Sequence, residues 1–142
     1  MPISTRAALA SATAFMLALA PMASAKTVKI SGTFHPEGAA TTKPTGHVTG
    51  TFNTVTDKVT YRITYSGLSG PVIASHFHGP AAPGQSAPVM LPIPAPYKSG
   101  MHGTLTADAV TAKALLAGKT YVNLHTTKYP MGEARAQISA HS

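Results

Sequence analysis

The chain has 142 residues, no cysteine, and 11 Lys and Arg against 4 Asp and Glu, which gives a formal net charge of +7. Without cysteine it has no disulfides, zinc–thiolate sites, blue-copper thiolates or cysteine nucleophiles. The basic residues are spread evenly and lack an accompanying run of aromatic residues, so the charge favours a solvated surface over nucleic-acid binding.

The first 25 residues predict a cleavable secretory signal peptide. Arg6 supplies the positive start, residues 7–20 are mainly apolar, and the small residues at 23–25 (ASA) fit the cleavage rule, so we expect cleavage before Lys26. The apolar run is shorter than the roughly 20 residues that span a bilayer. We therefore expect no transmembrane span in the mature form and export to the bacterial periplasm or the extracellular space.

Residues 26–142 predict a single β-rich domain. Gly and Pro, 12 of each in the chain, separate short runs rich in Val, Ile, Thr and Tyr, which is typical of a sandwich or barrel. Apolar and polar residues alternate along VTYRITYS, and this segment pairs with the preceding one as a predicted hairpin. The expected strands, in chain order, are residues 27–34, 46–53, 59–66, 71–78, 102–105, 120–126 and 133–139.

Two segments interrupt the strand pattern. Residues 79–100 contain prolines at six positions and predict a long irregular loop with at most a short edge strand near 89–91, because proline cannot donate to a β-ladder. Residues 107–116 are rich in Ala and Leu and predict one short helix. Thr106 is its expected N-cap, and Gly118 is expected to end it.

His76 and His78 form the sharpest local signal of chemistry. Residues i and i+2 of a strand share a face, so the two imidazoles point the same way and can close on one metal ion. His125 lies in another predicted strand, and all three imidazoles converge if the two strands are neighbours. Imidazole suits copper, zinc or nickel, and three nitrogens leave one coordination position open. Metal–nitrogen bonds close to 2 Å would place the ring nitrogens within about 4 Å of one another.

A structural polar network is the alternative interpretation of these residues. His125 would then pair with a carboxylate such as Glu133. Glu133 and Arg135 share a face by period two and would form an ion pair or a bracket on the neighbouring loop.

Three methionines offer thioethers that would favour Cu(I) if one lay close to the histidines: Met90, Met101 and Met131.

Hydrolytic catalysis has little support in the chain. There is no G-x-S-x-G elbow and no glycine-rich phosphate loop. The four carboxylates offer no pair for glycosidase chemistry. We therefore expect a protein that is not an enzyme.

Several ordered motifs resemble the CHRD (chordin-type) domain family. They are YSGLSGP at 65–71, HFHGPA at 76–81, LTA and then LLAGK within 105–119, YVNLHT at 121–126 and GEARAQ at 132–137. The resemblance covers residues 28–138, and Ala136 stands where the family usually has glycine. It implies an all-β, Greek-key (immunoglobulin- or superoxide-dismutase-like) antiparallel sandwich in a short bacterial secreted protein of undefined activity. Growth-factor binding by animal chordins depends on a multidomain setting and is not carried over.

Three functions compete. The first is a non-catalytic interaction module that binds a protein or another envelope component through the loop at 79–100, since loops on a rigid scaffold usually carry recognition. The second is a periplasmic copper- or zinc-binding protein that uses His76, His78 and His125. The third and weakest is a dismutase-like metalloenzyme, because the bridging histidine, zinc-ligand aspartate and disulfide of superoxide dismutase have no convincing counterparts here.

Overall fold

The computed structural model describes residues 2, 10–19 and 26–142. The expected cleavage motif at 23–25 and most of the start of the chain lie outside the described residues. Residues 10–19 form neither helix nor strand, and their large apolar side chains, among them Phe15 and Leu19, are 83–94% exposed. Within the described ranges, no helix is both long and apolar enough to cross a membrane.

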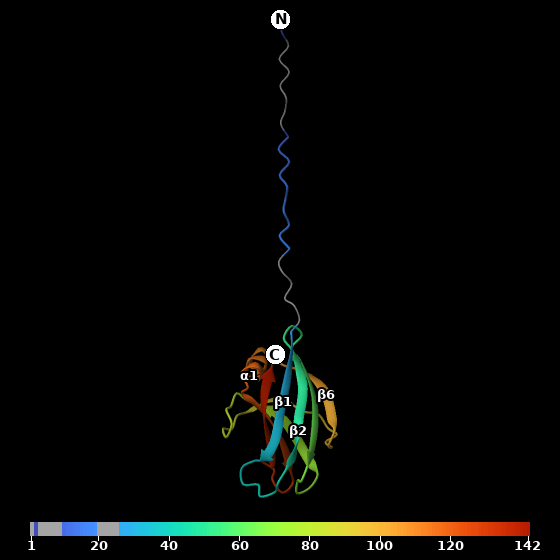
Figure 1. The fold of residues 1–142 in the computed structure, drawn as a ribbon, viewed down its shortest axis with the longest axis vertical. Coiled ribbons are helices and arrows are strands. Elements are labelled where there is room, and N and C mark those ends of the chain that lie inside the picture. The colour runs from blue at the N-terminus through green and yellow to red at the C-terminus, as the bar shows by residue number, and fades with distance from the viewer. Residues whose placement is uncertain (1, 3–9, 20–25) are drawn as a thin grey trace.

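Over residues 26–142, the chain forms one antiparallel sheet of eight strands with one short helix (Figure 1). This confirms the predicted all-β class. Across the sheet the strands run in the order β5-β4-β7-β8-β1-β2-β3-β6. Their bounds are β1 Thr27–Pro36, β2 Thr45–Asn53, β3 Lys58–Ser66, β4 Val72–His78, β5 Val89–Pro92, β6 Met101–Thr106, β7 Thr120–Thr126 and β8 Ala134–His141.

The period-two pattern of the sequence becomes the inner and outer faces of this sheet. In β3, Val59, Tyr61 and Ile63 are buried, while the residues between them are exposed. The predicted hairpin is formed by β2 and β3, with Phe52 opposite Val59. Strand β3 therefore contributes its apolar face to the interior and leaves its polar face outside.

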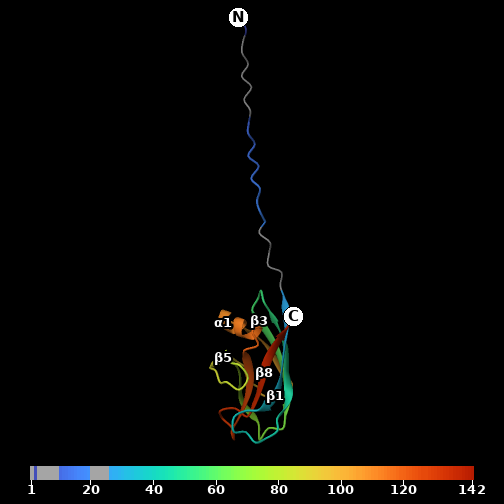
Figure 2. The same ribbon diagram turned by 60° about the vertical axis from the view of Figure 1, so that its left-hand side comes forward.

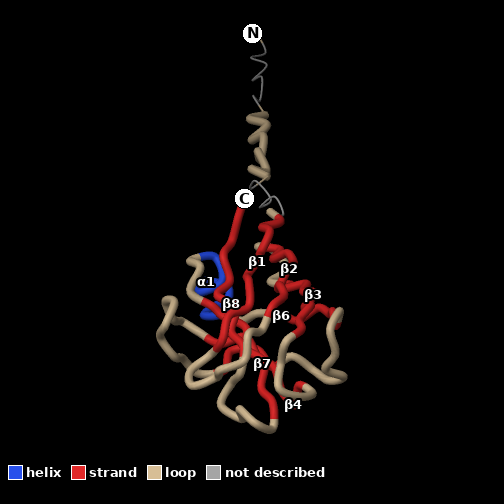
Figure 3. Tube along the Cα trace, turned by 60° about the horizontal axis from the view of Figure 1, so that its bottom comes forward, coloured by secondary structure: helices blue, strands red, loops and turns tan. Residues whose placement is uncertain are grey.

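The sheet curls around its core until it is nearly barrel-shaped (Figures 2 and 3). Tyr61 of β3 and Phe77 of β4 have four strands between them in the sheet. Their rings nevertheless pack edge to face, with the ring centroids 6.3 Å apart. Both belong to a single cluster of buried apolar residues. The strands β5 and β6 are the two edges, and β5 lies within the proline-rich stretch 79–100.

Helix α1 spans Ala109–Leu116 and starts later than the sequence predicted. Thr106 is the last residue of β6, where it pairs with Lys58, so it cannot cap the helix. The cap is Asp108, whose Oδ1 accepts a hydrogen bond from the backbone N–H of Thr111 at 2.7 Å. The predicted N-cap was therefore wrong by two residues.

Candidate metal centre

The pairing of β4 with β7 brings three histidines together on the outer face of the sheet. Phe77 points into the core and is fully buried, so its neighbours His76 and His78 point outward. Leu124 likewise points inward, and His125 outward. The condition set by the sequence, that the two histidine-bearing strands be neighbours, is met.

The ring nitrogens of the three imidazoles face one another. His76 Nδ1 lies 3.2 Å from His125 Nε2. Each of His76, His78 and His125 offers one nitrogen, and these three atoms all lie within 4.8 Å of one another. The His76–His125 pair falls inside the expected limit of about 4 Å.

Two of the rings are fixed from behind by backbone carbonyls. His78 Nδ1 donates to Ala87 O at 2.9 Å, and His125 Nδ1 donates to Pro130 O at 2.8 Å. Because a carbonyl oxygen only accepts, each Nδ1 carries the proton, and each Nε2 of a neutral ring carries its lone pair toward the cluster. Such second hydrogen bonds orient metal-binding imidazoles and set their tautomer.

The local electrostatics favour the neutral form of His76. Burial lowers the pKa of His76, and the neighbouring His125 and His78 lower that pKa further, against a smaller opposing effect of the Asn123 side chain. A metal ion binds the unprotonated imidazole, so a lowered pKa keeps more of the site competent at neutral pH.

A stack of side chains ties the cluster to the 79–88 loop. The His78 ring lies parallel to the Tyr121 ring at 4.9 Å, and the Arg135 guanidinium lies 3.6 Å from the centre of the same tyrosine ring. The Tyr121 hydroxyl accepts from the N–H of Ala87 at 3.1 Å. Arg135 also donates to two carbonyl oxygens of the loop. The loop that supplies the His78 partner is thereby held against β7 and β8.

Glu133 and Arg135 hold different loops. Both carboxylate oxygens of the fully buried Glu133 accept from the N–H of Ser69, at 2.9 and 3.1 Å, and one accepts from the Thr42 hydroxyl. Arg135 instead brackets the 79–88 loop. Among the described residues no hydrogen bond joins Glu133 to Arg135 or to His125. Of the two roles expected for the pair, these contacts correspond to the bracket.

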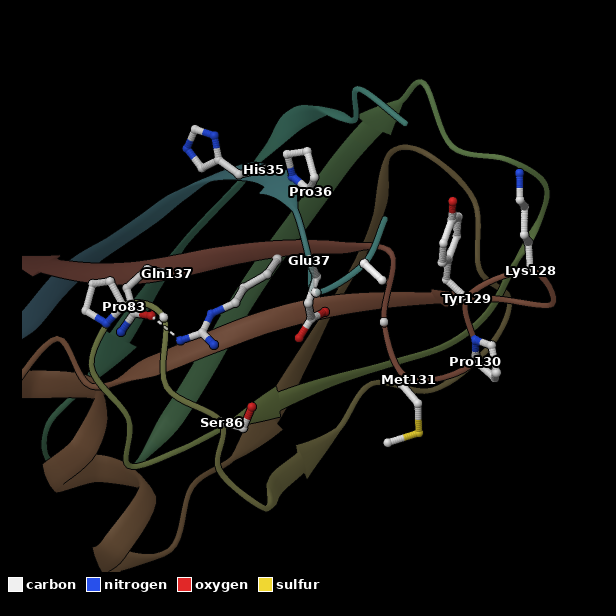
Figure 4. Close-up of a pocket in the computed structure, with 15 residues that line it drawn as sticks. His35, Pro36, Glu37, Pro83, Ser86, Lys128, Tyr129, Pro130, Met131 and Gln137 are labelled. Atoms are coloured by element: carbon white, nitrogen blue, oxygen red, sulfur yellow. Dashed lines mark hydrogen bonds between the residues drawn. The ribbon is translucent and has the colours of Figure 1, made fainter. Parts of the chain in front are cut away.

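A pocket of about 700 Å³ lies beside the cluster, and the Glu37 side chain occupies its middle (Figure 4). Burial raises the pKa of Glu37 to about 7, while the Arg135 charge and the Asn123 amide act in the opposite direction. Glu37 Oε2 is buried without a hydrogen-bond partner among the described residues. Gly132 forms part of the pocket wall with a φ of 124°, a backbone conformation that favours glycine.

The three methionines considered as soft ligands lie in different environments. Met101 is a core residue, 7% exposed. Met131 is 87% exposed and lines the pocket. The sulfur of Met90 lies beside Gly79, which follows His78 in the chain.

Asn123 and Glu37 belong to the site but were not assigned a role from the sequence. Asn123 shares the face of His125 by period two, a signal that the sequence did contain. Glu37 follows β1, and only the pairing of β1 with β8 brings it near β7. The carbonyls of Ala87 and Pro130 could not be identified from residue type, because every residue has a backbone carbonyl.

The fold and the cluster together define the class of protein: an all-β antiparallel domain with three converging imidazoles on the outer face of its sheet. A family model, the CHRD domain, matches residues 20–138. The chain therefore belongs to the CHRD domain family, which confirms the resemblance found in its motifs. No curated protein and no solved structure was found to match the chain.

Proposed function

We propose that this CHRD-domain protein binds a copper or zinc ion through His76, His78 and His125. The observation that carries the proposal is the convergence of the three ring nitrogens, with the Nδ1 atoms of His78 and His125 engaged from behind by carbonyls. Three imidazole nitrogens, two of them on rings held by a carbonyl at Nδ1, suit these metals and leave room for a further ligand.

Calorimetric titration of the purified protein with Zn(II) and Cu(II), and anaerobically with Cu(I), tests the proposal. We expect one ion per chain with a dissociation constant below about 1 µM for at least one metal. The His76→Ala/His78→Ala variant should lose that binding, whereas His47→Ala, which removes an exposed histidine of β2, should keep it. Binding weaker than micromolar, or equal binding by the double variant, would refute a metal site at this place.

Export to the periplasm or the cell exterior is part of the proposal. It is supported by Arg6, the apolar run at 7–20 and the small residues at 23–25. N-terminal sequencing of the protein recovered from periplasm and culture medium should begin at Lys26. Recovery of the uncleaved chain from the cytoplasm alone would contradict export.

The same proposal makes the protein a binding module that is not an enzyme. Glu133, one of the four carboxylates, is committed to Ser69 and Thr42, and Asp108 caps α1. Greek-key topology, as in an immunoglobulin- or superoxide-dismutase-like sandwich, is a further part of it and is supported by the strand order, in which β8 lies beside β1 and β2 and β3 follow. A protein or envelope partner that binds the loop at 79–100 is the remaining part of the proposal.

A further inference from the structure

Asn123 stands at the centre of the histidine cluster rather than beside it. It lies on β7 opposite His76 of β4 and is 2% exposed. Its Oδ1 lies 3.1 Å from His78 Nε2 and 2.9 Å from His125 Nε2. The amide oxygen is thus within contact distance of both nitrogens whose lone pairs point into the cluster.

This arrangement places electron-pair donors against one another. The Nδ1 protons of His78 and His125 are committed to carbonyl oxygens, so neither neutral ring has a proton on Nε2 to donate to the amide. Two nitrogen lone pairs and the carbonyl oxygen of Asn123 therefore face a common point. Buried acceptors without a donor are costly, and a cation among them removes that cost.

Glu37 is associated with the same amide. Burial raises the pKa of Glu37, and the Asn123 side chain lowers that pKa by a smaller amount. Glu37 is thus the outer partner of the amide, in the position of a group that can orient a metal ligand.

We propose that Asn123 Oδ1 is the fourth ligand of the ion held by His76, His78 and His125, and that this oxygen makes the site selective for a divalent ion over Cu(I). The inference rests on the proposed metal-binding function. An amide oxygen is a hard donor that suits Zn(II) and Cu(II), whereas Cu(I) prefers thiolates and thioethers. Met101 lies in the core and Met131 is exposed, so neither of these sulfurs replaces the oxygen.

Two substitutions with opposite expected effects test the role of Asn123. In Asn123→Leu, the oxygen is lost while the branched shape at Cγ is kept, and the affinity for Zn(II) and Cu(II) should fall about 10- to 100-fold. In Asn123→Asp, combined with Glu37→Gln so that no two carboxylates face each other, a charged oxygen replaces a neutral one, and the affinity should rise about tenfold. A merely structural asparagine predicts a loss, not a gain, in the second variant. The Cu(II) electron paramagnetic resonance spectrum should also change between the two.

The outcomes separate the two proposals. If the unaltered protein binds no metal, the proposed function fails. If it binds Zn(II) or Cu(II) and Asn123→Leu and the aspartate variant bind equally well, the function stands and the fourth ligand is refuted. Tighter binding of Cu(I) than of Cu(II), abolished by Met90→Leu, would also overturn the inference in favour of a soft site. Circular dichroism and the Glu37→Gln single variant control for folding and for the outer partner.

Discussion

Loading the protein with its metal ion is expected to raise the free energy of unfolding by about 4 kcal/mol when free ion is present at about a thousand times the dissociation constant. The gain arises because the three imidazoles are assembled only in the folded chain, where β4 pairs with β7. For a domain of this size the midpoint of thermal unfolding should rise by about 15 °C. Differential scanning calorimetry with metal, and again after addition of a chelator, measures the shift and its reversal.

The control for this shift compares the unfolding midpoint of each variant with and without metal. His78→Ala also removes the hydrogen bond to Ala87 and the stack on Tyr121, so its metal-free form should already be less stable. Its midpoint should nevertheless be insensitive to metal. His102→Ala, an exposed histidine of edge strand β6, should retain the full shift. A shift that persists in His78→Ala would place the stabilising ion elsewhere on the molecule.

The histidine pair was predictable because its geometry is local. His76 and His78 share a face wherever the segment is a strand, and the fully buried Phe77 between them shows that it is. Convergence with His125 depended on β4 lying next to β7, a pairing across the 79–119 segment that no residue type encodes. The sequence showed that convergence depends on this strand pairing, but the pairing itself is known only from the fold.

The partners of the site were harder to foresee, for physical reasons. The two groups that settle the imidazole tautomers are backbone carbonyls, which every residue carries. Glu133 and Arg135 were read as a pair from period two. The nearest donors for Glu133 are instead an N–H and a hydroxyl of loops brought in by the fold, of which Ser69 is the main one. A buried carboxylate takes whichever donors reach it, and these are set by tertiary structure.

The helix start shows the same limit on a smaller scale. Thr106 and Asp108 are both good N-cap residues, and composition alone does not separate them. The edge strand β6 decides between them because it keeps Thr106 in an extended ladder opposite Lys58. Local propensity therefore predicts that a helix forms here, whereas the pairing of β6 determines where the helix begins.

Phe77→Ala is expected to cost about 3–5 kcal/mol of unfolding free energy, since the side chain is fully buried and its removal leaves a cavity against Tyr61. That loss is a large share of the 5–15 kcal/mol that is usual for a domain, so the metal-free variant should unfold at much lower denaturant concentration. Ile73→Ala, at a half-exposed position of the same strand, should cost far less.

Metal should then offset the Phe77→Ala defect. The substitution acts on the inner face of β4, while the ligands His76 and His78 leave its outer face, so the folded variant should still assemble the cluster. At saturating Zn(II), about 4 kcal/mol of binding energy would bring its stability close to that of the metal-free parent. Denaturant unfolding of both proteins, with and without metal, measures separately the loss of stability from the substitution and the gain from metal binding. A small loss without metal would contradict the packing at Phe77. A full loss with no recovery on adding metal would instead show that the inner face of β4 sets the geometry of the outer one.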